Sequence, residues 1–147
     1  MIFWFVFFLT VLLDRVTKWL VAANMRSGQT IPVIADFFHI TFVENPGAAF
    51  GILAEKKALF IIVTLVILGV VFYLAHTQKN SGYLLSIAYA LVAGGAVGNM
   101  VDRLQTGLVV DFLDFRGIWP YIFNVADSAV VVGVLFLAVL ILRSDQI

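Results

Sequence analysis

Residues 58–75 read ALFIIVTLVILGVVFYLA, a run without a single charged side chain. A helix needs about 20 mainly apolar residues to cross the hydrocarbon core of a bilayer, so this run predicts a transmembrane helix. The rest of the chain agrees, because 63% of its 147 residues are hydrophobic and only 12% are charged. Soluble domains carry about 25% charged residues. The sequence therefore predicts an integral membrane protein whose single domain occupies residues 1–147 and leaves no room for a separate soluble domain.

Three more segments are predicted to cross the membrane, at residues 1–23, 83–101 and 122–142. The first is the most polar of them, since Asp14, Arg15 and Lys18 interrupt its second half. We expect it to be a retained helix rather than a cleaved signal peptide. No basic region precedes its apolar run, and charged residues follow where the small residues of a cleavage site would stand.

An even number of spans places both termini on one side of the membrane, and the connections 24–57 and 102–121 on the other. Asp102, Asp111 and Asp127 then gather at that second face. A carboxylate at the bilayer centre costs about 2.5–3.5 kcal/mol on insertion scales, so such groups usually have a function. The same face holds most of the cations near the spans, and the positive-inside rule would make it cytoplasmic. These cations are Arg26, Lys56, Lys57, Arg103 and Arg116, against Lys79 and Arg143 on the opposite side.

The first long connection is predicted to contain a β-strand. Residues 38–43 combine β-branched and aromatic side chains, which favour a strand. Asn45-Pro46-Gly47 provides a turn at its end, while residues 29–37 show no clear periodicity. Apolar residues on both sides of the strand indicate that it lies at the membrane interface.

Asn99 and Asp102 are three residues apart, and so share one face of the third predicted helix. We favour a structural interpretation of this pair over a catalytic one. In that interpretation Arg103 neutralises Asp102, and Asn99 hydrogen-bonds to another helix. Gly94 and Gly98 have the small-residue spacing that allows two membrane helices to pack closely.

Asp111 and Asp127 form a second candidate pair, 16 residues apart across the connection between the last two spans. Asn124 precedes Asp127 by one helical turn, where its amide could orient the carboxylate or cap the helix. Two close carboxylates in a low dielectric would share a proton, so that one acts as base on a water and the other as acid toward a carbonyl. The spacing alone leaves three functions open: an aspartic protease, a proton-coupled transporter with the acids as relay, and an assembly factor in which the acids only join helices.

Other chemistries have little support in the sequence. The chain has no cysteine, which removes thiolate nucleophiles, thiolate metal sites and disulfides. His39 and His76 are isolated from each other, so we expect no metal site. Nine basic residues balance nine acidic ones, which indicates no nucleic-acid partner.

Five segments, in this order along the chain, resemble the lipoprotein signal peptidases, the type II signal peptidases of bacteria. They are DRVTKWL from Asp14, VENPGAAFGIL from Val43, GNMVDRL from Gly98, VVDF from Val109 and FNVADSA from Phe123. The first alone would be a weak signal. The combination is highly specific and covers nearly the whole chain.

The resemblance implies an all-α membrane protein with four transmembrane helices and a small extracytoplasmic β-containing loop between the first two. It implies an aspartyl endopeptidase that cleaves diacylglyceryl-modified prolipoproteins just before the lipidated cysteine. In this family the catalytic acids lie in the VVDF and FNVADSA segments, which here means Asp111 and Asp127. The other positions that match family motifs are expected to bind substrate or support the site, and they are Asp14, Asn45, Gly47, Asn99, Asp102, Arg103, Asn124 and Ala126.

The resemblance also implies a location in the bacterial plasma membrane, with both termini cytoplasmic and the active site near the outer leaflet. This orientation opposes the count of cations, and we follow the resemblance. A monomer is expected, with membrane lipid and the prolipoprotein as its partners and with no metal or organic cofactor. The NPGAAF turn is expected to cover the substrate, with Gly47, Ala48 and Ala49 allowing close backbone approach and Phe50 dipping into the interface.

Overall fold

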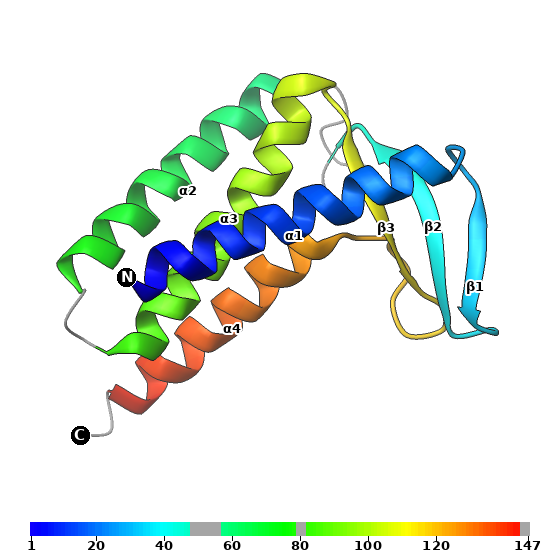
Figure 1. The fold of residues 1–147 in the computed structure, drawn as a ribbon. Helices are drawn as coiled ribbons and strands as arrows, with labels where there is room; N and C mark the ends of the chain where they lie inside the picture. Colours follow the sequence, from blue (N-terminus) through cyan, green and yellow to red (C-terminus); the bar gives the residue numbers. More distant parts are fainter. Residues whose placement is uncertain (48–56, 79–81, 145–147) are drawn as a thin grey trace.

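Four long helices and one small sheet make up the protein (Figure 1). The computed structural model describes residues 1–47, 57–78 and 82–144. The helices are α1 (Ile2–Asn24), α2 (Lys57–Thr77), α3 (Tyr83–Gln105) and α4 (Val125–Ser144). They confirm the four predicted helices, with differences at two ends. The third helix continues through Asp102 and Arg103, and the fourth begins at Val125 rather than at residue 122.

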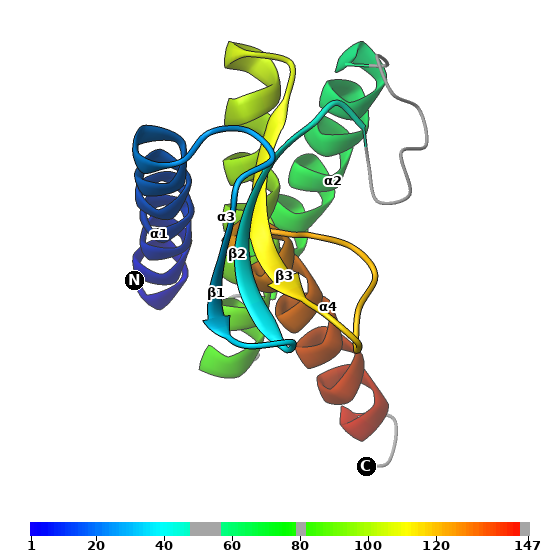
Figure 2. The ribbon, with the colours of Figure 1, turned by 90° about the vertical axis from the view of Figure 1, so that its right-hand side faces the viewer.

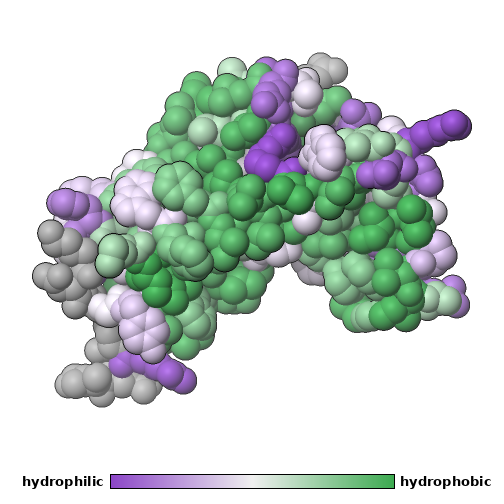
Figure 3. Space-filling model, in the orientation of Figure 1, coloured by the Kyte–Doolittle hydropathy of each residue, from purple (hydrophilic) through white to green (hydrophobic). Residues whose placement is uncertain are grey.

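Three of these helices are long and apolar enough to cross a membrane, namely α2, α3 and α4. The first helix misses that criterion because of its charged residues, yet two of these three, Asp14 and Lys18, are buried. Its buried positions form one stripe at helical spacing, consisting of Phe7, Thr10, Asp14, Lys18 and Val21. Large apolar side chains cover the opposite face of the helix, so α1 can lie in the membrane beside the other three. Figure 3 shows hydrophobic residues over most of the visible face of the bundle.

The third helix lies at the centre of the bundle and contacts each of the other three. Glycines allow this close packing, as their predicted spacing indicated. A Cβ on Gly94 would meet the Thr10 side chain of α1 at 2.8 Å, and one on Gly95 would meet the Ala126 carbonyl of α4 at 2.3 Å. The backbones therefore approach each other more closely than any larger residue would allow.

The sheet has three antiparallel strands in the order β1-β2-β3, formed by Thr30–Ile34, Phe38–Asn45 and Val109–Phe115. The second strand confirms the predicted strand and extends it by two residues. The first strand lies where no periodicity was seen. The third strand comes from the connection between α3 and α4, so the sheet is assembled from two loops. The register pairs Val43 with Asp111, beyond a bulge that follows Ile40.

One face of the sheet packs on the end of α1. Val21 of α1 and Met25, the residue that follows the helix, form a buried cluster with Phe42 of β2 and Phe112 of β3. Figure 2 shows the sheet standing across the end of the bundle, and β3 contacts both α1 and α3. The packing on α1 leaves the opposite face of β3, which carries Asp111, directed toward the ends of α3 and α4.

Candidate active site

Asp111 lies on β3 and is 3% exposed. Each of its carboxylate oxygens accepts a hydrogen bond from an asparagine amide. Asn45 donates to Oδ2 across 2.8 Å, and Asn124 donates to Oδ1 across 2.6 Å. A carboxylate removed from water needs such donors, because unmade hydrogen bonds to a buried charge are costly.

Asp127 lies in the first turn of α4 and is only partly buried. Its Oδ1 accepts a hydrogen bond from the Asn99 amide at 2.7 Å, and its Oδ2 accepts one from the Asn124 backbone N–H at 3.2 Å. In return the Asp127 backbone N–H donates to Asn124 Oδ1 at 2.9 Å. This reciprocal pair is a capping box, which explains why the helix begins after Asn124. It confirms the capping interpretation of that residue.

The amide orientations in the site follow from chemistry. Gly47 N–H donates to Asn45 Oδ1 at 2.9 Å, and Asp127 N–H donates to Asn124 Oδ1. Because a backbone N–H can only donate, the atom facing it must be the amide oxygen. The NH2 group of each asparagine is then left for the carboxylate of Asp111.

A cavity of about 1170 Å³ brings both acids together. Six of the ten predicted site residues line it, namely Asn45, Gly47, Asn99, Arg103, Asp111 and Asp127. Its walls are mostly apolar and come from three helices, for example Ile67 of α2, Val92 of α3 and Val131 of α4. The sheet and the connection before α4 add aromatic walls, including Trp119. The site is thus polar at one end and apolar along the bundle.

Burial is the main reason why the pKa of the Asp111 carboxyl rises from 3.8 to about 6. The hydrogen bond from Asn45 opposes this rise, and the nearby charge of Asp127 adds to it. The two carboxylates therefore interact electrostatically, as expected for two acids that line one cavity. A carboxyl with this pKa can hold or release a proton near neutral pH.

The other four predicted site residues lie behind the cavity. Asp14, Asp102, Asn124 and Ala126 are at most 4% exposed. Asp14 accepts a hydrogen bond from the Ala126 backbone N–H at 3.0 Å, and Asp102 accepts one from the Val110 backbone N–H at 3.4 Å. The two acids therefore fix the backbone next to Asp127 and next to Asp111, respectively.

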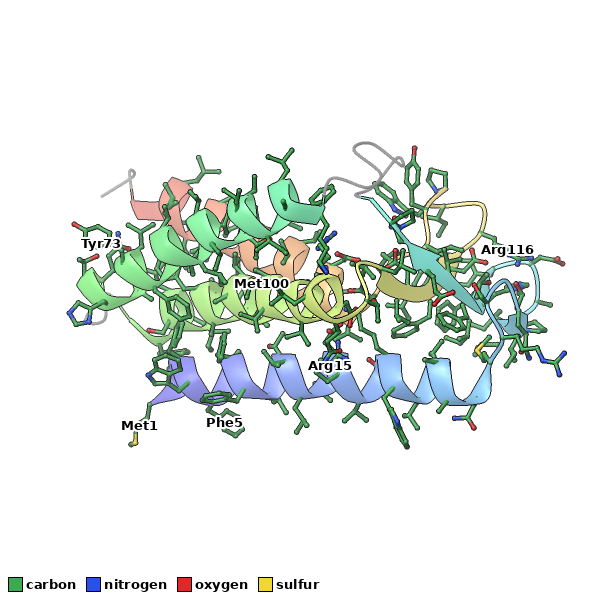
Figure 4. All side chains as sticks on the ribbon, turned by 90° about the horizontal axis from the view of Figure 1, so that it is seen from above. Met1, Phe5, Arg15, Tyr73, Met100 and Arg116 are labelled. Atoms are coloured by element: carbon green, nitrogen blue, oxygen red, sulfur yellow. The ribbon has the colours of Figure 1, made fainter. Side chains whose placement is uncertain are left out.

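The expected pairing of Asp102 with Arg103 is wrong. Asp102 is paired instead with Arg15 and Lys18 of α1, and Figure 4 shows Arg15 directed from α1 toward α3. Consecutive helical residues point in different directions, so an adjacent acid and base do not face each other. Arg103 turns to the cavity, where it donates to the Gly47 carbonyl at 3.3 Å and lies 4.7 Å from the centre of the Phe60 ring.

Sequence reasoning missed Lys18 as part of this site. Its Nζ lies 2.9 Å from Asp14 and 2.8 Å from Asp102, and it donates to Asn99 across 2.8 Å. The spacing of Asp14 and Lys18 by four residues was the available signal, since such a pair shares one helix face. The predicted covering residues Ala48, Ala49 and Phe50 lie outside the described residues. Within the described part of the chain, no group of three His, Cys, Asp or Glu side chains is arranged to hold a metal ion.

A helical membrane protein with two carboxylates on one cavity at the end of its bundle has the features of a membrane-embedded aspartic peptidase. Comparison with known proteins agrees with this class. The family model for signal peptidase (SPase) II, peptidase family A8, matches residues 6–143. The chain belongs to this family of aspartic signal peptidases.

Individual relatives and solved structures support the same assignment. The chain is 43% identical over 146 residues to a lipoprotein signal peptidase of Desulfitobacterium hafniense, a match that covers 99% of this chain and 96% of that one. A lipoprotein signal peptidase of Halothermothrix orenii is 42% identical over 139 residues, covering 95% and 94% of the two chains. A solved bacterial membrane enzyme superposes with a TM-score of 0.89 at 36% identity, covering 97% of this chain and 88% of that one. A second such structure gives a TM-score of 0.84 at 37% identity, with coverage of 96% and 92%.

Proposed function

We propose that the protein removes signal peptides from diacylglyceryl-modified bacterial prolipoproteins, cutting the peptide bond just before the lipidated cysteine. The observation that carries this proposal is the position of Asp111 and Asp127 on one cavity, each held by asparagine amides. Relatives across nearly the full chain are named lipoprotein signal peptidases, which supports this class of substrate.

In the proposed reaction, Asp111 and Asp127 share one proton and bind a water between them. The ionised carboxylate takes a proton from the water as its oxygen attacks the carbonyl carbon, and the protonated carboxyl donates to the carbonyl oxygen. The tetrahedral intermediate then collapses as the C–N bond breaks: the carboxyl that took the water proton gives it to the cysteine nitrogen, and the other carboxylate takes back a proton from a hydroxyl of the intermediate. The raised pKa of Asp111 supports this mechanism, because this carboxyl can hold the shared proton near neutral pH.

The cavity suits a substrate that enters from the membrane. Its apolar walls run along α2, α3 and α4 and can accommodate acyl chains and an apolar signal peptide, while the carboxylates and Arg103 form its polar end. Acids of the described residues, such as Asp14, lie toward the sheet end of the bundle, not through its whole length. This arrangement favours hydrolysis at one face over a proton relay across the membrane.

We propose that the protein is a monomer of the bacterial plasma membrane that requires no cofactor, with both termini in the cytoplasm and the sheet near the outer leaflet. Because the chain has no cysteine, Asp36→Cys introduces a unique thiol in the turn between β1 and β2. An impermeant maleimide should label this thiol in intact cells. Labelling that needs broken cells would reverse the proposed orientation.

The function is tested with purified protein in detergent and a diacylglyceryl-modified prolipoprotein, by measuring the released signal peptide. Asp111→Asn and Asp127→Asn should each abolish release, since an amide keeps the shape but cannot take the catalytic proton. Asp114→Asn is the matched control, because Asp114 lies on the same strand but binds Thr41 and Arg116. Release by either of the first two variants would refute the dyad.

A further inference from the structure

We propose that Lys18 is a positioning residue for Asp127: its ammonium fixes the side-chain amide of Asn99 so that the amide NH2 faces the Asp127 carboxylate. This inference rests on the proposed catalytic role of Asp127. It concerns a residue of α1, a helix that contributes no side chain to the lining of the cavity.

Lys18 is 2% exposed, and three oxygen atoms surround its Nζ. Two of them belong to carboxylates that form ion pairs with the ammonium, Asp14 at 2.9 Å and Asp102 at 2.8 Å. The third is Oδ1 of Asn99, at 2.8 Å. Arg15 also pairs with Asp102, so this cluster has two positive and two negative charges. Charge balance is complete without Asn99, so the hydrogen bond from Lys18 to Asn99 has a different consequence.

An ammonium can only donate, so the Asn99 atom that faces Lys18 must be the oxygen. The opposite end of the amide, the NH2 group, then faces Oδ1 of Asp127 at 2.7 Å. A reversed amide would direct its NH2 at the ammonium and its oxygen at the carboxylate, with a repulsive contact at each end. Asn124 strengthens the observed orientation, because its Nδ2 donates to the same Asn99 oxygen at 3.1 Å.

The fixed amide stabilises the ionised form of the dyad, because a carboxylate that accepts an N–H is favoured over its neutral form. The other two amides of the site take their orientation from backbone N–H groups, Gly47 for Asn45 and Asp127 for Asn124. Only Asn99 depends on a distant side chain. Lys18 is therefore the one of these three orienting groups that mutation can remove without altering the backbone.

Arg15 provides a matched control. It belongs to the same helix and the same charge cluster, and it binds Asp102 and Gln105 with no hydrogen bond to Asn99. The activity of the Arg15 variant therefore reports the contribution of the charge cluster alone. The activity of the Lys18 variant reports the contribution of the cluster together with that of the amide orientation.

The experiment compares Lys18→Met and Arg15→Met, each in the native and in the Asn99→Ala background, by cleavage of a diacylglyceryl-modified prolipoprotein. We expect Lys18→Met to lower kcat at least tenfold with KM changed less than threefold, and to move the acid limb of kcat/KM to higher pH. In the Asn99→Ala background it should cost less than twofold further. Arg15→Met should cost less than threefold in both backgrounds. Thermal unfolding in detergent verifies that each variant folds.

An equal loss from Lys18→Met in both backgrounds would overturn the inference, because Lys18 would then act without Asn99. If Lys18→Met does not fold, Lys18→Met with Asp14→Asn removes the unpaired acid and enters the same comparison. If Asn99→Ala cleaves too slowly to assay, the NMR chemical shift of the Asn99 side-chain 15NH2 group is measured in the two single variants instead. That resonance should move in Lys18→Met and stay in Arg15→Met; equal movement in both would also overturn the inference. The proposed function is tested separately: cleavage by the Asp127→Asn variant, in which Lys18 is intact, would refute the function and not the role of Lys18.

Discussion

The side chain of Asn124 joins the two candidate catalytic acids: its Nδ2 donates to Asp111 Oδ1 at 2.6 Å, and its Oδ1 accepts the backbone N–H of Asp127 at 2.9 Å. Asn124 is 0% exposed, so no water can replace these bonds. One buried amide thereby fixes a strand carboxylate relative to the start of a helix. The geometry of the pair therefore depends on this residue.

Asn124→Ala should reduce both activity and stability. It removes one of the two amide donors of Asp111 and also removes the helix cap. Loss of the cap alone lowers the free energy of unfolding by about 1 kcal/mol. We expect kcat to fall at least tenfold and the thermal unfolding temperature to fall as well. Asn45→Ala is the control, because Asn45 donates to Asp111 but caps no helix. If the two variants unfold at the same temperature, the cap contributes nothing measurable.

Asp111→Asn should stabilise the protein more at pH 7 than at pH 4. The folded-state pKa of Asp111 is about 6, above the ordinary 3.8, so the folded state binds more protons between these values. Its free energy of unfolding therefore falls as pH rises from about 4 to about 6, by about 3 kcal/mol at most. An amide has no such dependence. Unfolding measured across this pH range checks the prediction, and a constant difference between variant and parent would contradict it.

Asp114→Asn should have the opposite pH dependence. Partial burial acts to raise the pKa of Asp114, but hydrogen bonds from Thr41 and Arg116 outweigh it and leave the pKa below its ordinary value. Such a carboxyl adds stability above the unfolded-state pKa, and this stability is lost as pH falls through the folded-state value. The variant should therefore be less stable than the parent at pH 7 and approach it in acid. A larger deficit at acid pH would show that the assignment is incorrect.

Gly98→Ala should destabilise the bundle where α3 meets α1. A Cβ at this position would lie 2.5 Å from Asp14 Oδ2 and 3.2 Å from the Ala126 side chain. Overpacking of this kind costs about 1–3 kcal/mol, and Asp14 cannot retreat without leaving Lys18. Gly69→Ala is the matched control in α2, because its Cβ would have no neighbour within 4 Å. Equal unfolding temperatures for the two variants would contradict the close packing.

Asp102→Ala should be among the most destabilising changes outside the cavity. It leaves the ammonium of Lys18 buried with Asp14 as its only carboxylate, and it removes the charged partner of Arg15. Breaking one partner of a buried ion pair costs about 3–5 kcal/mol. Arg116→Ala breaks the more exposed Asp114 pair and should cost under about 1 kcal/mol. Unfolding in denaturant compares the two, and similar losses would contradict this ranking.

Much of the arrangement could be predicted from local patterns. Apolar runs located the four helices, and their even number placed Asp111 and Asp127 at one face. The spacing of Asn124 and Asp127 indicated a helix start, because a cap involves residues only three apart. The strand of Asp111 was not predicted, since its partner strand contains Asn45, 66 residues earlier in the chain. Which strands pair over such a distance cannot be predicted from either segment alone.

The sequence by itself determined that this is a helical membrane protein, because hydrophobicity and helical spacing are properties of neighbouring residues. Only the tertiary structure decided which charges meet. Asp102 has Arg103 beside it in the chain, yet it pairs with Arg15 and Lys18 across the bundle. In an apolar interior a buried charge must find a partner wherever the packing allows, and the glycines of α3 bring α1 close enough to provide one. The orientation of Asn99 toward Asp127 follows from that packing.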